Sequence, residues 1–286
     1  MTHNGLFVGL VTLDFLYGVS EYPAQNQKVV ASDYTVAAGG PATNAAVTFS
    51  FLKNQAQLLA VLGTHPISEL IRADLTQQNV ILTDLDPTRS EPPTVSSILV
   101  TPKTGDRTVV SINAVKSQVS VESLPQNCLD GVDIVLIDGH QMEVSQQIAK
   151  LAREQEIPVV IDGGSWKPGF EMVLPYVDYA ICSANFYPPD CQTAADVFAY
   201  LYDMDILFIA RTQGNQPIQY RSPNREGEIQ IPPILAVDTL GAGDVFHGAF
   251  CHFILQSSFV KSLKAAAEIA ACSCQSFGTR QWIKSS

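Results

Sequence analysis

The chain has 286 residues, 46% of them hydrophobic and 16% charged, which is the composition of a globular protein able to bury a substantial core. Its formal net charge of −11 argues against a general nucleic-acid binder, because affinity for a phosphate backbone depends on clustered Lys and Arg. We expect a single domain spanning residues 1–286 and no nucleic-acid partner.

Neither a membrane span nor a secretory signal is indicated. Residues 34–52 lack charged side chains but contain Gly39, Gly40 and Asn44, which is unlike a lipid-facing helix. Residues 1–14 carry no Lys or Arg before their apolar run and no evident cleavage site. We therefore expect a cytoplasmic protein with no membrane partner.

The six cysteines, at positions 128, 182, 191, 251, 272 and 274, include no Cys-x-x-Cys pair. Zinc sites and disulfide frameworks usually show recognisable spacings of that kind. We interpret these residues as core or pocket thiols.

The first predicted element is the apolar run from Leu6 to Asp14, which indicates a strand that ends in a carboxylate. The segment from Ser20 to Ala37 is rich in Val, Thr and Ser, and the segment from Thr94 to Asn113 has a similar composition with period-two patterning. We interpret both segments as antiparallel strands added to a main sheet.

A pair of glycines, Gly39 and Gly40, precedes Asn44 and the helix-like stretch 45–49. Paired glycines let main-chain N–H groups approach a ligand closely, and the Asn44 amide can both donate to and accept from hydroxyl groups. This arrangement suits a polyol. Taken alone, a Gly-Gly pair before a helix is usually just an ordinary turn.

Short apolar runs then alternate with helical stretches. They cover Ile134 to His140, Val159 to Gly164, Tyr179 to Ala184 and Ile206 to Thr212. Between the first two, residues 144–152 place Val144, Ile148 and Leu151 on one helical face. This alternation predicts an α/β fold with a mostly parallel sheet.

The run from Val237 to Phe246 places a small-residue turn and a carboxylate at the start of an apolar helix. Gly241 and Gly243 permit a tight turn, and the free N–H groups of the following helix favour an anion. Asp244 would then accept a proton from an attacking hydroxyl, which is the geometry of phosphoryl transfer. The alternative is an ordinary helix start capped by Asp238 or Thr239.

These two motifs together resemble the signatures of the ribokinase-like (PfkB) carbohydrate kinases, which are Gly-Gly-x-x-x-Asn and Asp-Thr-x-Gly-Ala-Gly-Asp-x-Phe, and they occur in the expected order. The resemblance implies a three-layer αβα fold with a mostly parallel central sheet and a small β-strand lid formed by segments 20–37 and 94–113. It also implies ATP and Mg²⁺ as cofactors, a small sugar as substrate, and the possibility of a homodimer through the lid. The catalytic residues it implies are Asp244 and the anion-hole residues Gly241, Ala242 and Gly243.

For the sugar, the resemblance implies contacts from Asp14, Gly39, Gly40, Asn44, Arg107 and His140. Asp14 and His140 end predicted strands, where ligands gather in a parallel sheet. Arg107 lies in Gly-Asp-Arg-Thr, which resembles the Gly-Asn-Arg-Thr turn of ketohexokinase-like members, and together with the sequence after Asp244 it favours a ketohexose or sulfo-sugar. Turn and capping roles are the alternative for each of these side chains.

For the nucleotide, the resemblance implies contacts from Asn185, Thr212, Gly214, Thr239, Cys274 and Gly278.

One departure from the family pattern concerns the metal. Many members carry Asn-x-x-Glu where this chain has Asn185 followed by Phe186, Tyr187 and Pro188, so the glutamate is absent and Asp190 is a displaced candidate. We assign no metal ligand, since Mg²⁺ is often held mainly by nucleotide phosphates and water. A monovalent-cation site near Asp238 and Gly278 is a further family possibility.

The leading hypothesis is thus an ATP-dependent sugar kinase. A nucleoside kinase of the same family is the nearest alternative, and a sugar or nucleotide binder without turnover is the second, motivated by the missing glutamate. A dinucleotide-binding domain fits less well, because Gly9 after the first strand has no partner glycines in a Gly-x-Gly-x-x-Gly spacing.

Overall fold

The computed structural model describes residues 2–101, 103, 105–112 and 118–284. A nine-stranded sheet lies at its centre, with strands in the order β13-β12-β11-β10-β9-β8-β1-β4-β5. The strands from β11 to β5 run parallel, and β12 and β13 add an antiparallel hairpin at one edge. Their bounds are β1 Asn4–Val8, β4 Gln55–Ala60, β5 Val80–Asp84, β8 Ile134–Ile137, β9 Val159–Gly163, β10 Tyr179–Ser183, β11 Phe208–Gln213, β12 Gln216–Ser222 and β13 Arg225–Ile229.

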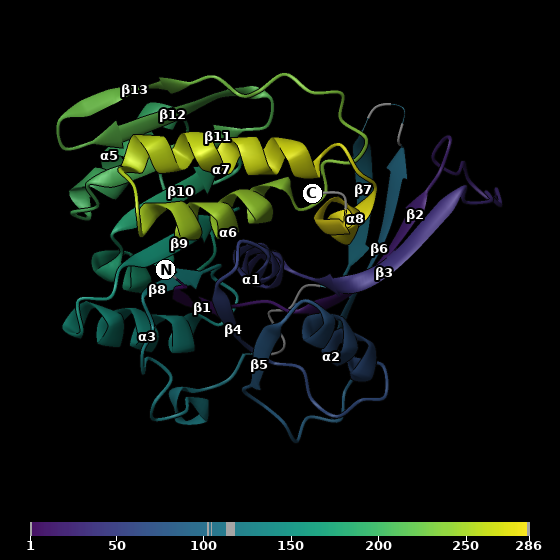
Figure 1. The fold of residues 1–286 in the computed structure, drawn as a ribbon, viewed down its shortest axis with the longest axis horizontal. Helices are drawn as coiled ribbons and strands as arrows, with labels where there is room; N and C mark the ends of the chain where they lie inside the picture. The colour runs from purple at the N-terminus through teal and green to yellow at the C-terminus, as the bar shows by residue number, and fades with distance from the viewer. Residues whose placement is uncertain (1, 102, 104, 113–117, 285–286) are drawn as a thin grey trace.

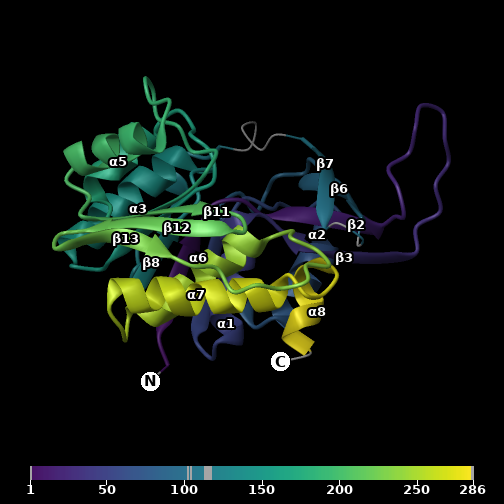
Figure 2. The same ribbon diagram turned by 90° about the horizontal axis from the view of Figure 1, so that it is seen from above.

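Helices cover both faces of this sheet (Figures 1 and 2). One face carries α1 (Pro41–Phe51), α6 (Ala242–Ile254) and α7 (Phe259–Ser273), and the other carries α3 (Met142–Glu154), α4 (Phe170–Val173) and α5 (Ala194–Asp203). Successive strand residues point to opposite faces of the sheet, so Phe7 packs in the hydrophobic core on the side of α1, α6 and α7. Its neighbours Leu6 and Val8 pack in the core on the other side. The expected three-layer αβα fold is confirmed.

Four further strands form a separate small sheet in the order β3-β2-β6-β7, seen beyond α8 in Figure 1. Its strands are β2 (Thr12–Gly18), β3 (Asp33–Gly39), β6 (Thr94–Thr101) and β7 (Asp106–Ser111). Strand β2 pairs antiparallel with β3 and parallel with β6, and β6 pairs antiparallel with β7. The remaining elements are α2 (Ser68–Gln77), α8 (Gly278–Lys284) and two short 3₁₀ turns, Val121–Ser123 and Leu174–Tyr176.

The prediction of one strand from Leu6 to Asp14 is wrong. The chain leaves the main sheet after Val8 and enters the small sheet at Thr12. Asp138 explains the break, because its Oδ2 accepts the Leu10 N–H (2.9 Å) and a Cβ at Gly9 would lie 1.9 Å from its Oδ1. Only glycine fits beside that carboxylate, so the backbone turns there, and Asp14 lies within β2 rather than at a strand end.

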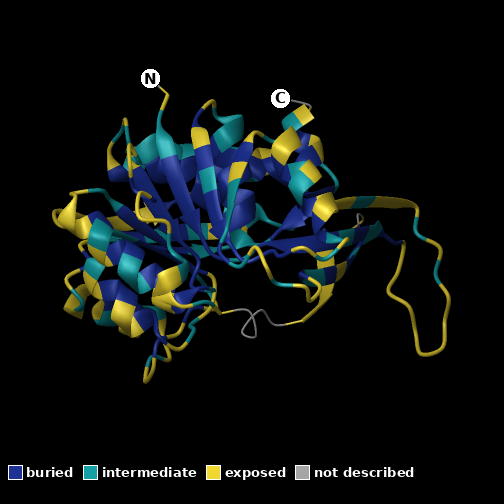
Figure 3. Ribbon diagram, turned by 90° about the horizontal axis from the view of Figure 1, so that it is seen from below, coloured by how far each residue is buried: buried dark blue, intermediate teal, exposed yellow. Residues whose placement is uncertain are grey.

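The predicted strand pattern in segment 20–37 is also wrong over most of its length. Only residues 33–37 are in a strand, and 20–32 form an exposed loop that projects from the molecule (Figures 2 and 3). Residues 20–32 include Pro23 and offer few apolar side chains for burial, so no face of a strand forms there. Segment 94–113 does form the expected antiparallel pair, β6 and β7, whereas Asn113 lies outside the described residues. Both segments belong to the separate sheet rather than to the main one.

The predicted middle strands and their crossover helix are confirmed as β8, β9, β10, β11 and α3. Among the described residues, no helix is both long and apolar enough to cross a membrane.

Candidate active site

The turn that precedes α6 has the geometry of an anion site. Gly241 adopts φ 72°, which favours glycine, and it caps a helix whose first residues are Ala242, Gly243 and Asp244. No hydrogen bond among the described residues takes up the backbone N–H groups of Gly243 and Asp244. A Cβ on Gly243 would meet nothing within 4 Å, so this turn borders open space. The N-terminus of α6 can therefore receive a negatively charged group.

Asp244 lies beside this turn among side chains from three other elements. Its Oδ2 accepts a hydrogen bond from Asn44 Nδ2 (2.8 Å) on α1. Burial and the nearby charge of Asp162 raise the pKa of Asp244 to about 7, against the Asn44 hydrogen bond and the charge of His247. A carboxyl with a pKa near neutrality is well matched to accept a proton from a hydroxyl.

His247 is a buried residue on α6 that links this cluster to the sheet. Its Nδ1 lies 2.7 Å from the Gly243 carbonyl oxygen and 3.4 Å from Asp162 Oδ2, and its Nε2 lies 3.1 Å from the Ile181 carbonyl oxygen. The ring thus ties the first turn of α6 to β9 and β10. This contact fixes where the anion site stands relative to the strand ends.

Three residues expected to bind the sugar are adjacent. The buried Asp14 accepts a hydrogen bond from Thr12 Oγ1 (2.6 Å), and a Cβ on Gly39 would lie 1.9 Å from Asp14 Oδ2. Burial raises the pKa of Asp14, against hydrogen bonds from Thr12 and Ser96. Gly40, at φ 101°, opens α1 and passes so close to the Leu10 carbonyl that a side chain would collide with it. The structure therefore brings Asp14, Gly39 and Gly40 together at the start of α1.

Asp138 holds this region in place by accepting hydrogen bonds from backbone N–H groups. Its Oδ2 accepts N–H groups from Leu10 (2.9 Å) and Ala42 (3.1 Å), so it caps α1 as well as the crossing between the two sheets. Burial opposes its ionisation, but the charge and hydrogen bond of His140 and the charge of Lys167 hold its pKa down at about 2. Asp138 is a structural anion rather than a group open to substrate.

His140 is committed to the same carboxylate. Its Nδ1 and its backbone N both lie 3.0 Å from Asp138 Oδ1, and Lys167 Nζ donates to the Asp138 carbonyl (3.2 Å). The side chain of His140 is 17% exposed. Its predicted sugar contact stays a prediction.

Arg107 lies against Thr239, in the turn that precedes α6, rather than against Asp14. From β7 it donates through Nη1 to the side-chain oxygen (2.9 Å) and the carbonyl oxygen (3.3 Å) of Thr239. Thr239 Oγ1 in turn donates to the Gly105 carbonyl (3.1 Å). The β6–β7 hairpin is thereby held over the residues that lead into the anion site.

The residues expected to bind nucleotide lie at the ends of β10 and β11. Asn185 is exposed just after β10, Thr212 is near the end of β11, and Gly214 (φ 63°) makes the turn to β12. Sequence reasoning missed the buried Arg211, which donates to the Ala184 carbonyl (3.0 Å) and the Tyr187 hydroxyl (3.1 Å). Arg211 thus holds the loop that carries Asn185. Its position in an otherwise apolar strand was the available signal.

The remaining nucleotide candidates meet at a second junction. Asp238 accepts the Leu240 N–H (2.8 Å) through Oδ1 and the Gly278 N–H (2.9 Å) through Oδ2. The Cys274 carbonyl accepts N–H groups from Val237 and Asp238, and burial raises the pKa of its thiol. The loop before α6 and the turn before α8 are therefore held together by hydrogen bonds.

Sequence reasoning also missed Arg280 and Asp74. Arg280 Nη1 donates to Asn44 Oδ1 (3.0 Å), and Arg280 pairs with Asp74 on α2 (3.1 Å). Nothing in the local pattern around either residue pointed to the site, because their partners are far away along the chain.

No group of three or more His, Cys, Asp or Glu suited to a metal occurs within the described ranges. Pro188 stands where the resemblance places glutamate, and Asp190 is exposed beyond it. All six cysteines are free, and Cys272 is exposed, against the expectation of a core or pocket thiol.

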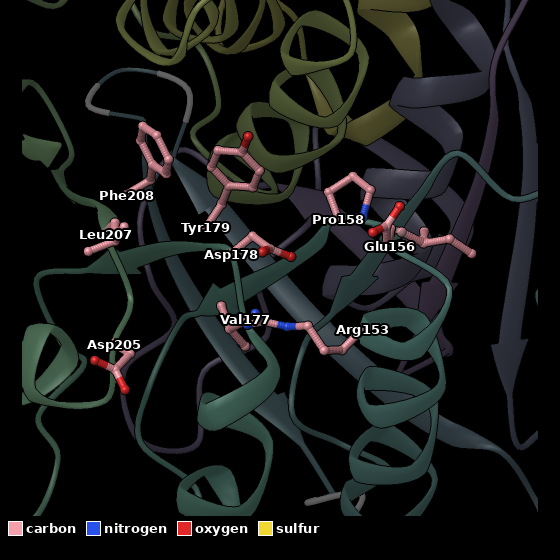
Figure 4. Close-up of a pocket in the computed structure, with 10 residues that line it drawn as sticks. Arg153, Glu156, Pro158, Val177, Asp178, Tyr179, Asp205, Leu207 and Phe208 are labelled. Atoms are coloured by element: carbon pink, nitrogen blue, oxygen red, sulfur yellow. The ribbon is translucent and has the colours of Figure 1, made fainter. Parts of the chain in front are cut away.

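A hollow of about 550 Å³ lies at the opposite end of the main-sheet strands, where β9, β10 and β11 begin (Figure 4). Arg153, Asp178 and Phe208 are among its lining residues. It contains none of the candidate site residues.

Known proteins resemble this chain over nearly its whole length. The model of the pfkB family of carbohydrate kinases matches residues 3–285. A ribokinase of Bacillus subtilis is 24% identical, with 97% of this chain and 94% of that protein covered. The ribokinase structure from Thermotoga maritima superposes with a TM-score of 0.82 at 19% identity, covering 100% of this chain and 99% of that one. Arabidopsis thaliana ribokinase, solved with ribose and ATP, gives 0.79 at 18% identity, covering 99% and 98%.

Proposed function

The chain belongs to the pfkB family of carbohydrate kinases, and we propose that it transfers the γ-phosphoryl group of ATP to a hydroxyl of a small sugar or sugar derivative. The observation that carries this proposal is the position of Asp244, a carboxyl of near-neutral pKa in the first turn of α6, beside the helix N-terminus. Both groups that phosphoryl transfer requires, a base and an anion site, meet there.

In the proposed mechanism, Asp244 accepts the proton of the attacking hydroxyl. The N–H groups of Gly243 and Asp244 stabilise charge on the transferring phosphoryl group, because they point outward from the N-terminus of α6. Asp14, the Gly39–Gly40 turn and Asn44 hold the sugar. Asp14 lies against Gly39 just before α1, and Asn44 on α1 donates to Asp244, which supports this division of roles.

The small sheet acts as a lid over this site. Its hairpin already reaches Thr239 through Arg107, so closing it would exclude water and limit wasteful hydrolysis of ATP. Arg107 would then add a positive charge beside the phosphoryl group. Thr212, Gly214, Cys274 and Gly278 surround the remaining nucleotide.

Magnesium bound to the ATP phosphates would neutralise their charge. The residues present fit a metal held mainly by phosphates and water, because Asn185 is exposed beside the nucleotide candidates and Pro188 replaces the expected glutamate. The monovalent cation stays a prediction.

Exposed apolar side chains on the small sheet support a homodimer through that sheet. All six residues of the edge strand β7 are exposed, including Val110 at 71%, and Tyr34 on β3 is 70% exposed. An uncovered edge strand of this kind is a common site of pairing between chains.

The experiment that tests the function measures ADP release from magnesium-ATP with ketoses, aldoses, sulfo-sugars and nucleosides. We expect one substrate class to support release. In the Asp244→Asn variant, release should fall by about 10²–10⁴-fold while sugar binding persists, because only the base is lost. In the wild type, kcat/KM should decline below about pH 7, where Asp244 takes up a proton.

Two other results would contradict the proposal. Undiminished turnover in Asp244→Asn would remove Asp244 as the base. Sugar binding without ADP release in the wild type would favour a non-catalytic binder.

A further inference from the structure

A line of hydrogen bonds connects Arg280 on α8 to the proposed base. Arg280 Nη1 donates to Asn44 Oδ1 (3.0 Å), and Asn44 Nδ2 donates to Asp244 Oδ2 (2.8 Å). Arg280 is 9% exposed and Asn44 is 4% exposed, so water has little access to either link. The three side chains come from three different helices.

The guanidinium gives the Asn44 amide a single favourable orientation. The amide oxygen faces the cation of Arg280 and the amide NH₂ faces the carboxylate of Asp244. A 180° rotation would set oxygen against carboxylate and NH₂ against guanidinium, which are two repulsive contacts. Within the described part of the chain, Arg280 is the hydrogen-bond donor to the Asn44 amide oxygen, so its removal leaves that end of the amide without this contact.

Arg280 is itself held in place by Asp74. Asp74 Oδ2 accepts from Arg280 Nε (3.2 Å) and Nη2 (3.1 Å). Arg280 and Asp74 also bind the backbone of Ala38. The Ala38 carbonyl accepts a hydrogen bond from Arg280 Nη2 (2.6 Å), and the Ala38 N–H donates to Asp74 Oδ2 (2.9 Å). Ala38 immediately precedes the Gly39–Gly40 turn, so the ion pair also sets the position of that turn.

We propose that Arg280, anchored by Asp74, is a positioning residue that aims the Asn44 amide at Asp244 and fixes the Gly39–Gly40 turn. The kinetic part of this inference rests on the proposed kinase function. The geometric part concerns the Asp244 carboxyl and can be tested whether or not a substrate has been found.

The effect of Arg280 on Asn44 can be measured through the pKa of Asp244. Asp162 on β9 and Asp138 after β8 raise its pKa, whereas His247 on α6 and the hydrogen bond from Asn44 lower it. If Arg280 orients Asn44, its removal lets the amide rotate and weakens that hydrogen bond. The pKa of Asp244 should then rise, by about 0.5–1 pH unit.

The test is a ¹³C NMR titration of the Asp244 carboxyl, assigned with Asp244→Asn, in a double-mutant cycle. The proteins are the wild type, Arg280→Met, Asn44→Ala and the double variant. We expect Arg280→Met to raise the pKa of Asp244 in the wild-type background and to leave it unchanged when Asn44 is already Ala. An equal rise in both backgrounds would mean that Arg280 acts only through its charge, which would overturn the positioning role, as would no rise at all.

Two variants guard against a trivial loss of fold. Arg280→Lys keeps a positive charge beside Asp74 but cannot contact Asp74, Ala38 and Asn44 together, so it should fold and still raise the pKa of Asp244. Arg72→Met removes the arginine of another ion pair made from α2, Arg72 with Asp84 (2.9 Å), and should not change that pKa. A change of the same size in Arg72→Met would also overturn the proposal.

With a substrate in hand, Arg280→Met should lower kcat/KM for the sugar by about 10- to 100-fold, since it removes a charge-assisted hydrogen bond. The acid limb of its pH profile should move upward with the Asp244 titration. Absence of turnover in the wild type would contradict the proposed function alone, because the NMR cycle would still decide the role of Arg280.

Discussion

At the scale of single residues, the site depends on Asp244, a carboxyl whose ionised form is disfavoured in the folded protein. Burial and the charge of Asp162 raise the pKa of Asp244 from 3.8 to about 7. The folded protein therefore binds more protons than the unfolded chain between these values. Its stability should decline as pH rises from about 4 to about 7, and the loss should be complete above that range.

Asp244→Asn should accordingly stabilise the protein at pH 8 and leave its stability unchanged near pH 4. The gain cannot exceed about 4 kcal/mol, which is the value of roughly three pKa units. Urea unfolding of both proteins at several pH values measures it. The exposed Asp203 at the end of α5 provides the control, since Asp203→Asn should show no such pH dependence. A variant less stable than wild type at pH 8 would contradict this account of Asp244.

Local sequence located two candidate residues through the motifs that carry them. Asp244 lies at the helix start that its glycines indicated, and Asn44 lies close to it. Arg280 and Asp74 could not be found in this way, because their roles arise from contacts 236 and 36 positions away along the chain. Such partners become visible only when the helices have been placed.

At the scale of elements, the site depends on how closely α1 and α6 approach each other. Gly248 makes that approach possible, because a Cβ there would lie 2.2 Å from the Ala45 carbonyl oxygen and 2.8 Å from Thr48 Cβ. Asn44 is on α1 and Asp244 is on α6. Their 2.8 Å hydrogen bond therefore depends on a glycine one helical turn away.

Gly248→Ala should separate the two helices, destabilise the protein by about 1–3 kcal/mol and lower kcat. Thermal unfolding together with the ADP-release assay measures both effects. Gly243→Ala is the matched control for stability, because it lies in the same helix and its Cβ would meet nothing within 4 Å. That control should be neutral or slightly stabilising, since Ala favours helix more than Gly does. Equal stability of Gly248→Ala and wild type would show that the helices can adjust.

Most strands and the crossover helix were predictable because their apolar periodicity is local. The break between Val8 and Thr12 was not predictable, because it depends on Asp138. This residue lies about 130 positions later and accepts a hydrogen bond from the Leu10 N–H. Apolar residues continue across the break, so hydrophobicity alone gives no sign that one strand has become two. The strand predicted over 20–32 is absent for a local reason, since this segment contains Pro23 and few apolar side chains that a partner could bury.

At the scale of the whole molecule, the small sheet carries exposed apolar side chains on both of its edge strands, β3 and β7. Val110 and Ile112 are 71% and 68% exposed, and Tyr34 lies on another strand of the same sheet. A composition of 286 residues could not indicate which strands would be left uncovered. The homodimer expected from the family resemblance stays a prediction that this surface favours.

Val110→Lys should convert such a dimer to a monomer, which light scattering after size-exclusion chromatography measures directly. Ile81→Lys is the control, because Ile81 is 61% exposed on β5, an edge strand of the main sheet, where no interface is proposed. A wild-type protein that is monomeric at all concentrations, or a dimer broken equally by both changes, would contradict the predicted interface.

The long sequence separations within the site also determine the order in which it can form during synthesis. The pairing of β2 with β6 must wait until residue 94 has emerged, and the bond from Asn44 to Asp244 spans 200 positions. The bond that orients Asn44 must wait for residue 280. A nascent chain on the ribosome can thus pair β2, β3 and β6 long before the turn that precedes α6 has been synthesised. The protein should acquire activity late, in one final docking of α6 and α8 against elements folded much earlier.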